Sequence, residues 1–280
     1  MKTLHLFEAF GIEVEYMIVN KDTLMPQPSA GEVIREVMGD YVCVVDRGEM
    51  SWSNEFVMHV IEIQAAEPCP IPGTDGKIYN EVLHINSLLE KHNAVLMPTG
   101  VHPFLNPQKD AKLWPYENKH IYDTFDRIFN CLRHGWVNLQ SCQINLPFCG
   151  DTEFEALHAA IRFLMPVMPA LSASTPVAEG KRAEFADFRL DTYRSNSSKI
   201  PSITGSVIPE PCYSHDAYQT EILQQIYRDI KPHDTDGILG YEWLNARGAI
   251  ARFDRNAIEI RILDMQECPS ADVAVCDAIV

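Results

Sequence analysis

The chain has 280 residues, 46% of them hydrophobic, and its 39 Asp and Glu outnumber its 23 Lys and Arg, which gives a formal net charge of -16. This length and composition can form a substantial core, which excludes a short peptide, a disordered tail and a fibrous repeat. The negative charge and the absence of a basic run in the sequence disfavour a nucleic-acid partner, because phosphate backbones would be repelled on average.

Periodic apolar residues predict alternating strands and helices without an obvious linker or internal repeat. In chain order we expect strands at 10–19, 41–45 and 55–64, helices at 78–96 and 121–132, a strand at 137–146, helices at 154–164 and 217–230, and a strand at 257–263. The segment 172–215 is rich in Ser, Pro and Thr, so we interpret it as loops, where binding groups concentrate.

Signals for export and for membrane insertion are absent from the sequence. Glu8 interrupts the apolar N-terminal stretch, and the longest apolar run, 163–171, contains Pro166 and Pro169 and is far shorter than the ~18 residues of a membrane span. Eight cysteines are scattered without a C-x-x-C pair, which argues against a zinc site or a secreted disulfide framework. We therefore expect a cytoplasmic protein with reduced thiols and no membrane partner.

Four predicted strands carry acidic, amide, hydroxyl and guanidinium groups on one face and apolar groups on the other. The polar set is Glu13 and Glu15, then Glu62 and Gln64, then Ser141, Gln143 and Asn145, then Glu259 and Arg261. The solvent face of an ordinary antiparallel sheet would alternate in the same way. These faces contain no Lys, however, and adjacent carboxylates raise each other's pKa unless a cation lies near. Clusters of oxygen donors without His or Cys are typical of Mg²⁺ or Mn²⁺ sites.

Other motifs are less informative. The GTDGK segment at 73–77 lacks the spacing of a phosphate-binding loop, and the sequence contains neither H-E-x-x-H nor G-x-S-x-G. The ten histidines are dispersed, and we interpret them as structural or surface residues. Cys142 lies on the apolar side of its strand, so we interpret it as a core residue. Arg189 and Arg194 are either surface charges or partners for a phosphate or a substrate carboxylate.

Several short motifs occur in order across nearly the whole chain. They are GIEVE at 11–15, Glu55, VIE at 60–62, PVMPALSASTP at 166–176, AIEIRIL at 257–263 and Gln266. Together they resemble the glutamate-cysteine ligase and carboxylate-amine ligase group of the glutamine-synthetase-like superfamily. The resemblance implies an α+β fold: an antiparallel sheet with helices on its outer face and an acidic, funnel-shaped concave face that holds ATP and two or three Mg²⁺.

The resemblance also implies roles for individual residues. It implies metal ligands at Glu13, Glu15, Glu55, Glu62 and Glu259, catalytic arginines at Arg261 and Arg189, and substrate-binding residues at Gln143, Asn145, Arg189 and Arg194. Because Glu55 and Glu62 differ in strand parity, a bulge or a strand start is expected between them. The QINL segment at 143–146 is similar to plant-type glutamate-cysteine ligases and departs from the His-x-His of the carboxylate-amine ligase branch. This difference favours glutamate as a substrate.

The function implied is an ATP-dependent ligase that forms an amide between a carboxylate and an amine through an acyl phosphate. We expect Mg²⁺ or Mn²⁺ as cofactor and ATP, an amino acid and an amine as small-molecule substrates. The sequence is also compatible with a homo-oligomer. Two alternatives remain: a non-catalytic nucleotide-binding or regulatory protein of the same fold, and a metal-dependent guanidino or amide hydrolase. A nucleophilic Cys for such a hydrolase is not evident. We expect one catalytic domain over 1–280, incomplete at its C-terminus, because the apolar helix-compatible residues 271–280 end without a Gly cap or a polar tail.

Overall fold

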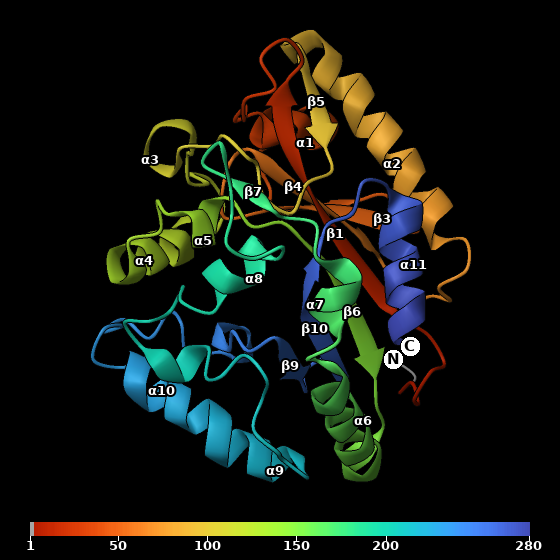
Figure 1. The fold of residues 1–280 in the computed structure, drawn as a ribbon, viewed down its shortest axis with the longest axis vertical. Helices are drawn as coiled ribbons and strands as arrows, with labels where there is room; N and C mark the ends of the chain where they lie inside the picture. The colour runs from red at the N-terminus through yellow and green to blue at the C-terminus, as the bar shows by residue number, and fades with distance from the viewer. Residues whose placement is uncertain (1–2) are drawn as a thin grey trace.

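A large antiparallel sheet is the centre of the computed structural model, which describes residues 3–280 (Figure 1). Its strands are β1 (Gly11–Asn20), β2 (Val44–Asp46), β3 (Met50–Asn54), β4 (Val60–Ala65), β5 (Ala94–Met97), β6 (Ser141–Pro147), β9 (Ala249–Arg252) and β10 (Ala257–Asp264). They lie in the order β2-β3-β4-β1-β6-β10-β9, and β5 pairs with β1. A separate hairpin is formed by β7 (Val177–Ala178) and β8 (Lys181–Arg182).

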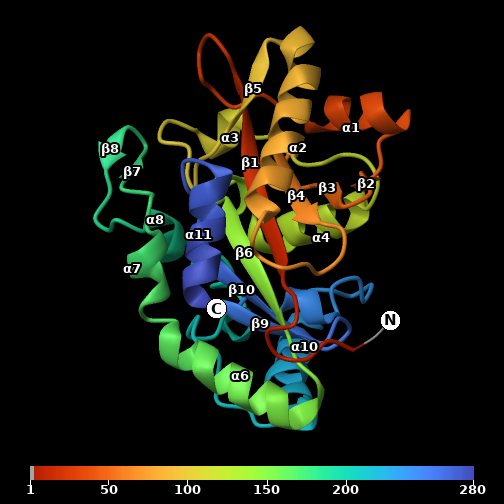
Figure 2. The same ribbon diagram turned by 90° about the vertical axis from the view of Figure 1, so that its right-hand side faces the viewer.

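Helices pack on both sides of the sheet. They are α1 (Ala30–Met38), α2 (Thr74–Leu89), η1 (Glu90–His92), α3 (Pro107–Asp110), α4 (Lys119–Phe129), α5 (His134–Val137), α6 (Gly150–Leu164), α7 (Met168–Ser172), α8 (Phe188–Tyr193), η2 (Pro201–Ile203), α9 (His215–Tyr218), η3 (Gln219–Leu223), α10 (Gln224–Ile230), η4 (Glu242–Leu244) and α11 (Pro269–Ile279). Figure 2 shows α2 and α11 side by side over one face of the sheet. Within residues 3–280, the helices are all too short or too polar to cross a membrane.

The two faces of β1 have opposite character, as the sequence predicts. Ile12, Val14 and Tyr16 are buried in the main apolar core, which the sheet shares with helices such as α2 and α11. Glu13 and Glu15 lie on the other face, because successive side chains of a strand point in opposite directions. The apolar face therefore anchors the strand, and each buried aliphatic side chain contributes about 1.5–3 kcal/mol. That anchoring fixes the position of the acidic face.

The predicted helix at 78–96 is wrong at its C-terminal end. Helix α2 ends at Leu89, η1 follows, and Ala94–Met97 forms β5. Asn93 turns the chain with a φ of 52°, in the left-handed region that Asn tolerates better than most residues. Short apolar runs fit a buried strand as well as a helix, which is why the spacing alone did not separate the two.

Strand positions were predicted less accurately than strand faces. Strands β3, β5 and β9 were not predicted, and each has five residues or fewer. The strand expected at 55–64 begins only at Val60, and the strand expected at 137–146 begins only at Ser141. The late start of β4 places Glu55 in a loop, so the expected strand start between Glu55 and Glu62 is confirmed. The helix expected at 217–230 lies within the consecutive elements α9, η3 and α10.

Candidate functional site

Strand register aligns the acidic residues across the middle of the sheet. Glu15 lies directly opposite Glu62 of β4, and Glu13 lies opposite Gln143 of β6. On the next pair of strands, Asn145 lies opposite Glu259 of β10. Directly opposed residues on one face have Cβ atoms ~4.5–5.5 Å apart, so their side chains interact. The carboxylates predicted from strand parity therefore come from neighbouring strands on one surface.

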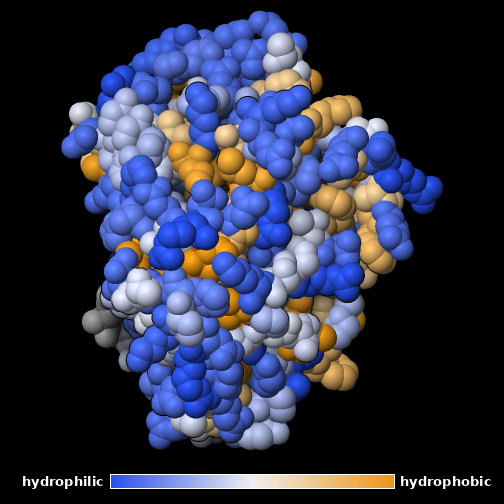
Figure 3. Space-filling model, turned by 90° about the vertical axis from the view of Figure 1, so that its left-hand side faces the viewer, coloured by the Kyte–Doolittle hydropathy of each residue, from blue (hydrophilic) through white to orange (hydrophobic). Residues whose placement is uncertain are grey.

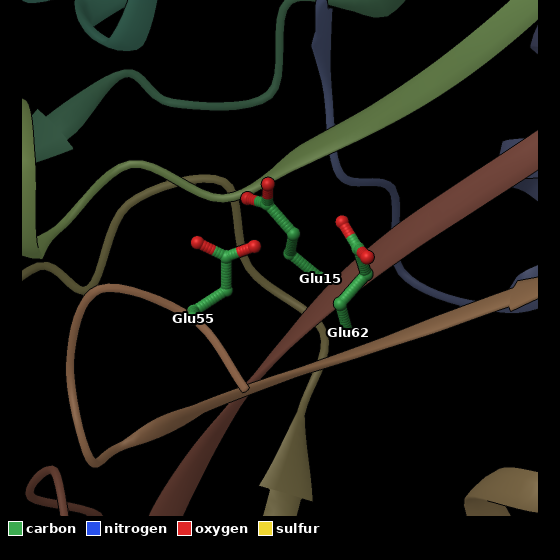
Figure 4. A group of neighbouring side chains, drawn as sticks. All are labelled: Glu15, Glu55 and Glu62. Atoms are coloured by element: carbon green, nitrogen blue, oxygen red, sulfur yellow. The ribbon is translucent and has the colours of Figure 1, made fainter. Parts of the chain in front are cut away.

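Three of these carboxylates form a compact cluster. Oxygen atoms of Glu15, Glu55 and Glu62 all lie within 4.8 Å of one another. Figure 4 shows the three carboxylates on the same side of the strands, with Glu55 supplied by the loop that precedes β4. That loop is held in part by the Phe56 backbone N–H, which donates to Glu55 Oε2 at 3.3 Å. Such a set of oxygen atoms is suited to a hard divalent cation.

Neutral donors orient the carboxylates of this cluster. Glu15 accepts from the Ser141 backbone N–H at 2.7 Å, from Ser141 Oγ at 3.2 Å and from Gln143 Nε2 at 3.0 Å. Glu62 accepts from Ser53 Oγ at 2.7 Å. These bonds fix the direction of the oxygen atoms but supply no positive charge. The cluster therefore retains its negative charge when ionised.

Burial and mutual repulsion disfavour ionisation of the cluster. Burial, followed by the charge of Glu15, raises the pKa of Glu55 to about 8. Burial and the charges of Glu13 and Glu55 raise the pKa of Glu62 well above its usual range. Burial also raises the pKa of Glu15, although Arg189 opposes the shift. Closely placed carboxylates must bind either protons or a cation, so the donor set fits a divalent metal.

A second acidic group lies beside this cluster and is paired with arginines. Glu259 lies 2.9 Å from Arg261 Nε and 3.3 Å from Arg252 Nη1. Glu13 accepts from Asn145 Nδ2 at 2.9 Å and lies 3.9 Å from Arg255 Nη1. Burial, followed by the charge of Glu259, raises the pKa of Glu13 to about 7. This part of the site carries both positive and negative side chains, so it is suited to anionic groups that cations bridge to the carboxylates.

Arg189 is held inside the protein by a polar network. Its side chain is 3% exposed, and its Nη2 donates to the Arg261 carbonyl oxygen at 2.9 Å. Its Nη1 lies 3.8 Å from Asp264 Oδ1, and among the described residues neither Nε nor Nη1 has a hydrogen-bond partner. Asp264 in turn accepts from Ser174 N–H at 3.0 Å and from Thr175 Oγ1 at 2.8 Å. The Ser-Thr pair of the PVMPALSASTP segment thus supports the buried carboxylate beside Arg189.

Glu15, Glu55, Gln143, Arg189 and Arg261 line one cavity of about 350 Å³. Its remaining walls are Phe56, Tyr122, Phe125, Gly135, Trp136, Leu139, Ser141, Tyr193, Asn196, Ser197, Ile203, Trp243, Leu244 and Ala246. This volume is that of a small-molecule site. The cavity is therefore lined by charged, polar and aromatic side chains together.

The structure does not bring every predicted residue to this cavity. Arg194 is 63% exposed and pairs with Asp191 at 2.7 Å on the same helical segment, outside the cavity lining. Asn145 donates to Glu13 rather than facing the cavity. Glu62 also lies outside the lining, although it belongs to the carboxylate cluster, and Glu13 and Glu259 lie outside it in the neighbouring acidic group. The predicted residues thus divide into a cavity set and a second set beside it.

Sequence reasoning missed several charged residues at the site. Arg252 and Arg255 approach the acidic face from β9 and the turn after it, and that strand was not predicted. Asp264 follows the AIEIRIL motif directly, but a register shift between Ile260 and Leu263 decides which side it reaches. The simple alternation of residues in β10 contains no signal for such a bulge.

One family model matches nearly the whole chain. A model of glutamate-cysteine ligase family 2 matches residues 9–279. An uncharacterized protein of Archaeoglobus fulgidus is 35% identical over 266 residues, covering 95% of this chain and 71% of that protein. A provisionally named glutamate–cysteine ligase 2 of Herpetosiphon aurantiacus is 22% identical over 243 residues, covering 84% of this chain and 59% of that protein.

A solved structure shows a similar fold. The crystal structure of a glutamate–cysteine ligase from Francisella tularensis in complex with AMP matches with a TM-score of 0.59 at 14% identity, covering 94% of this chain and 62% of that chain. The chain thus spans less than two thirds of the Herpetosiphon and Francisella proteins. The likeness supports a mixed fold with a mostly antiparallel sheet and packed helices, as expected from the sequence.

Proposed function

Because the chain belongs to glutamate-cysteine ligase family 2, we propose that it is an ATP-dependent ligase that joins a carboxylate to an amine through an acyl phosphate. The observation that carries this proposal is the Glu15, Glu55 and Glu62 cluster beside Arg189 and Arg261. Family membership supports the ligase class, and the nucleotide in the Francisella complex supports use of ATP. In this proposal the acidic face is the floor of a funnel that opens to the substrates.

We assign Mg²⁺ or Mn²⁺ to Glu15, Glu55 and Glu62, with Glu13 and Glu259 as ligands in the neighbouring group. Their oxygen-only donors suit these hard cations. Burial and the charges of neighbouring carboxylates raise the pKa values of Glu55 and Glu62, and a cation would offset this cost of ionisation. When bound, such ions neutralise the negative charge of the β- and γ-phosphates. Ser141, Gln143 and Ser53 keep the ligand oxygen atoms oriented.

The protein's own groups then position the reactants. Arg189 binds the carboxylate substrate through Nε and Nη1, the two donors that lack a hydrogen-bond partner in residues 3–280. A carboxylate oxygen attacks the γ-phosphorus and ADP leaves, with Arg261 offsetting the charge on the transferred group. The amine then attacks the acyl carbon, the phosphate leaves with the bond pair, and the amine loses a proton. This sequence needs no covalent protein nucleophile.

We further propose that the carboxylate is the side chain of glutamate. Gln143 and Ser141 offer neutral hydrogen-bonding groups to such a substrate, and Arg189 offers positive charge. Arg194, which is exposed and pairs with Asp191 outside the cavity lining, would then not contact the substrate. Its conservative replacement is therefore a useful comparison with that of Arg189.

The test is a panel of amino acids incubated with ATP, Mg²⁺ and hydroxylamine, with hydroxamate and phosphate release as readouts. We expect hydroxamate with glutamate and a loss of at least about 100-fold in Glu15→Gln, because one ligand carboxylate is removed. The matched control is Glu49→Gln, since Glu49 is 77% exposed and pairs with Lys77 away from the site. No hydroxamate with any amino acid, from protein shown to bind ATP, would defeat the ligase proposal in favour of a regulatory protein.

A further inference from the structure

The cavity is lined by two chemically different groups of residues. The first group, here called the charged end, consists of Glu15, Glu55, Arg189 and Arg261. The second group is a set of five aromatic residues, here called the aromatic chamber: Phe56, Tyr122, Phe125, Trp136 and Trp243. Figure 3 shows the side of the molecule that carries α4 and α10, where hydrophobic side chains gather in the middle of a largely hydrophilic surface. The charged end can hold the reacting carboxylate, which leaves the chamber for another group.

The aromatic chamber is a connected cluster rather than a scatter of rings. The ring centroid of Phe56 lies 5.3 Å from that of Tyr122 and 5.7 Å from that of Trp136. Phe125 joins Trp136 at 5.4 Å and Trp243 at 5.9 Å. These rings come from the loop before β4, from α4 and α5, and from η4, so four separate segments build one wall. The rings of this cluster are only partly buried, which leaves apolar surface for a ligand.

Each group of lining residues has a buried, unpaired donor near it, Trp136 in the aromatic chamber and Tyr193 beside the charged end. Trp136 Nε1 and Tyr193 Oη are buried, and neither has a hydrogen-bond partner in the part of the chain that the structure describes. Buried donors normally have a hydrogen-bond partner, because a buried donor without a hydrogen bond costs about 1–3 kcal/mol. A ligand that combines an apolar ring with a hydrogen-bond acceptor would satisfy both the walls and these donors.

We infer that the amine substrate of this protein carries an aromatic ring, which the aromatic chamber binds while the amino group faces the charged end. The inference rests on the proposed ligase function and narrows its amine to the class of arylalkylamines. Flat rings pack against aromatic walls in offset or edge-on geometry, and this packing adds to the burial of apolar area. A short amine such as ethylamine would leave the chamber wet and its walls unused.

The adenine ring is the other flat group that could enter such a chamber. The arginines suited to a triphosphate favour a different place for the nucleotide. Arg252 and Arg255 lie beside Glu259 and Glu13, outside the cavity lining, and Arg255 is 53% exposed. In the proposed function the nucleotide then extends from the metal ligands toward Arg252 and Arg255 and away from Phe125 and Trp243. The aromatic chamber therefore remains available to the amine.

The test compares 2-phenylethylamine, tyramine and ethylamine as amines, with ATP, Mg²⁺ and the carboxylate that gives hydroxamate. Burial of one phenyl group predicts that kcat/KM for 2-phenylethylamine exceeds that for ethylamine by about 10- to 100-fold. Trp243→Leu and Phe125→Leu should reduce this preference about 3- to 10-fold, because they remove ring contacts but keep an apolar side chain at each position. The matched control is Phe163→Leu, an aromatic residue on α6 that is 82% exposed.

Hydroxylamine separates the two proposals, because this small amine does not need the chamber. Hydroxamate formation without a preference for the aromatic amines would overturn the chamber assignment and leave the ligase proposal standing. No hydroxamate at all would defeat the ligase proposal, and quenching of tryptophan fluorescence by 2-phenylethylamine would then test the chamber alone. Quenching in wild type that is weakened in Phe125→Leu would support it, and no quenching would overturn it. A loss of ATP affinity in Trp243→Leu would assign the chamber to adenine instead.

Discussion

Replacing Glu55 with Gln should make the metal-free protein more stable above neutral pH. The pKa of Glu55 is raised from 4.5 to about 8 by burial and by Glu15. A raised pKa means that the stability contributed by this carboxyl group is present below pH 4.5 and is lost as pH rises through about 8. At about 1.4 kcal/mol per pH unit, the full loss would be about 5 kcal/mol. Because Glu55 is partly exposed, we expect roughly half of that value.

The assay is urea unfolding at pH 5 and pH 8 in the presence of a chelator. The wild type should lose stability between these pH values, and Glu55→Gln should lose about 2–3 kcal/mol less. Glu49→Gln, the exposed control, should follow the wild type. Mg²⁺ should reverse the order at pH 8, because it stabilises the wild type by binding the folded state but lacks one ligand in Glu55→Gln. Identical pH dependence in all three proteins would refute the reasoning about the cluster.

Three further predictions concern other parts of the site and the core. Arg189→Lys should raise KM for the carboxylate at least about 10-fold with little change in KM for ATP, whereas Arg194→Lys should leave both unchanged, as steady-state kinetics will show. Mg²⁺ affinity measured by calorimetry should rise between pH 6 and pH 8, because protons compete for Glu55; constant affinity would contradict this. Between pH 4 and pH 7, Asp272→Asn should lose about 2–4 kcal/mol less unfolding free energy than the wild type, because burial raises the pKa of Asp272 to about 7. Equal losses in the two proteins, measured by urea unfolding, would count against this.

The acidic face was predictable because a strand has a period of two. Glu13 and Glu15 had to share one face once Ile12 and Val14 were assigned to the core, and the structure confirms that assignment. Strand parity also required a break between Glu55 and the strand that follows it. Such inferences succeed because they depend on local geometry alone.

The rest of the site depends on long-range packing that periodicity does not encode. Phe125 has the spacing of a core position on α4, yet it lines the cavity because η4 brings Trp243 opposite to it. Arg252 reaches Glu259 through the pairing of β9 with β10, and β9 was too short to be recognised. The position of Asp264 depends on a bulge. A residue's partner across a fold is set by topology, and topology was available only through the family resemblance.

The most direct test of the central claim follows oxygen from the carboxylate to phosphate. Glutamate labelled with ¹⁸O in its side-chain carboxylate is incubated with the protein, ATP, Mg²⁺ and hydroxylamine, and the released phosphate is analysed by mass spectrometry. An acyl phosphate transfers one carboxylate oxygen to the phosphate when the amine displaces it, so we expect one ¹⁸O in each phosphate released. Unlabelled phosphate accompanied by hydroxamate would contradict the account, because the carboxylate would then have been activated by another route.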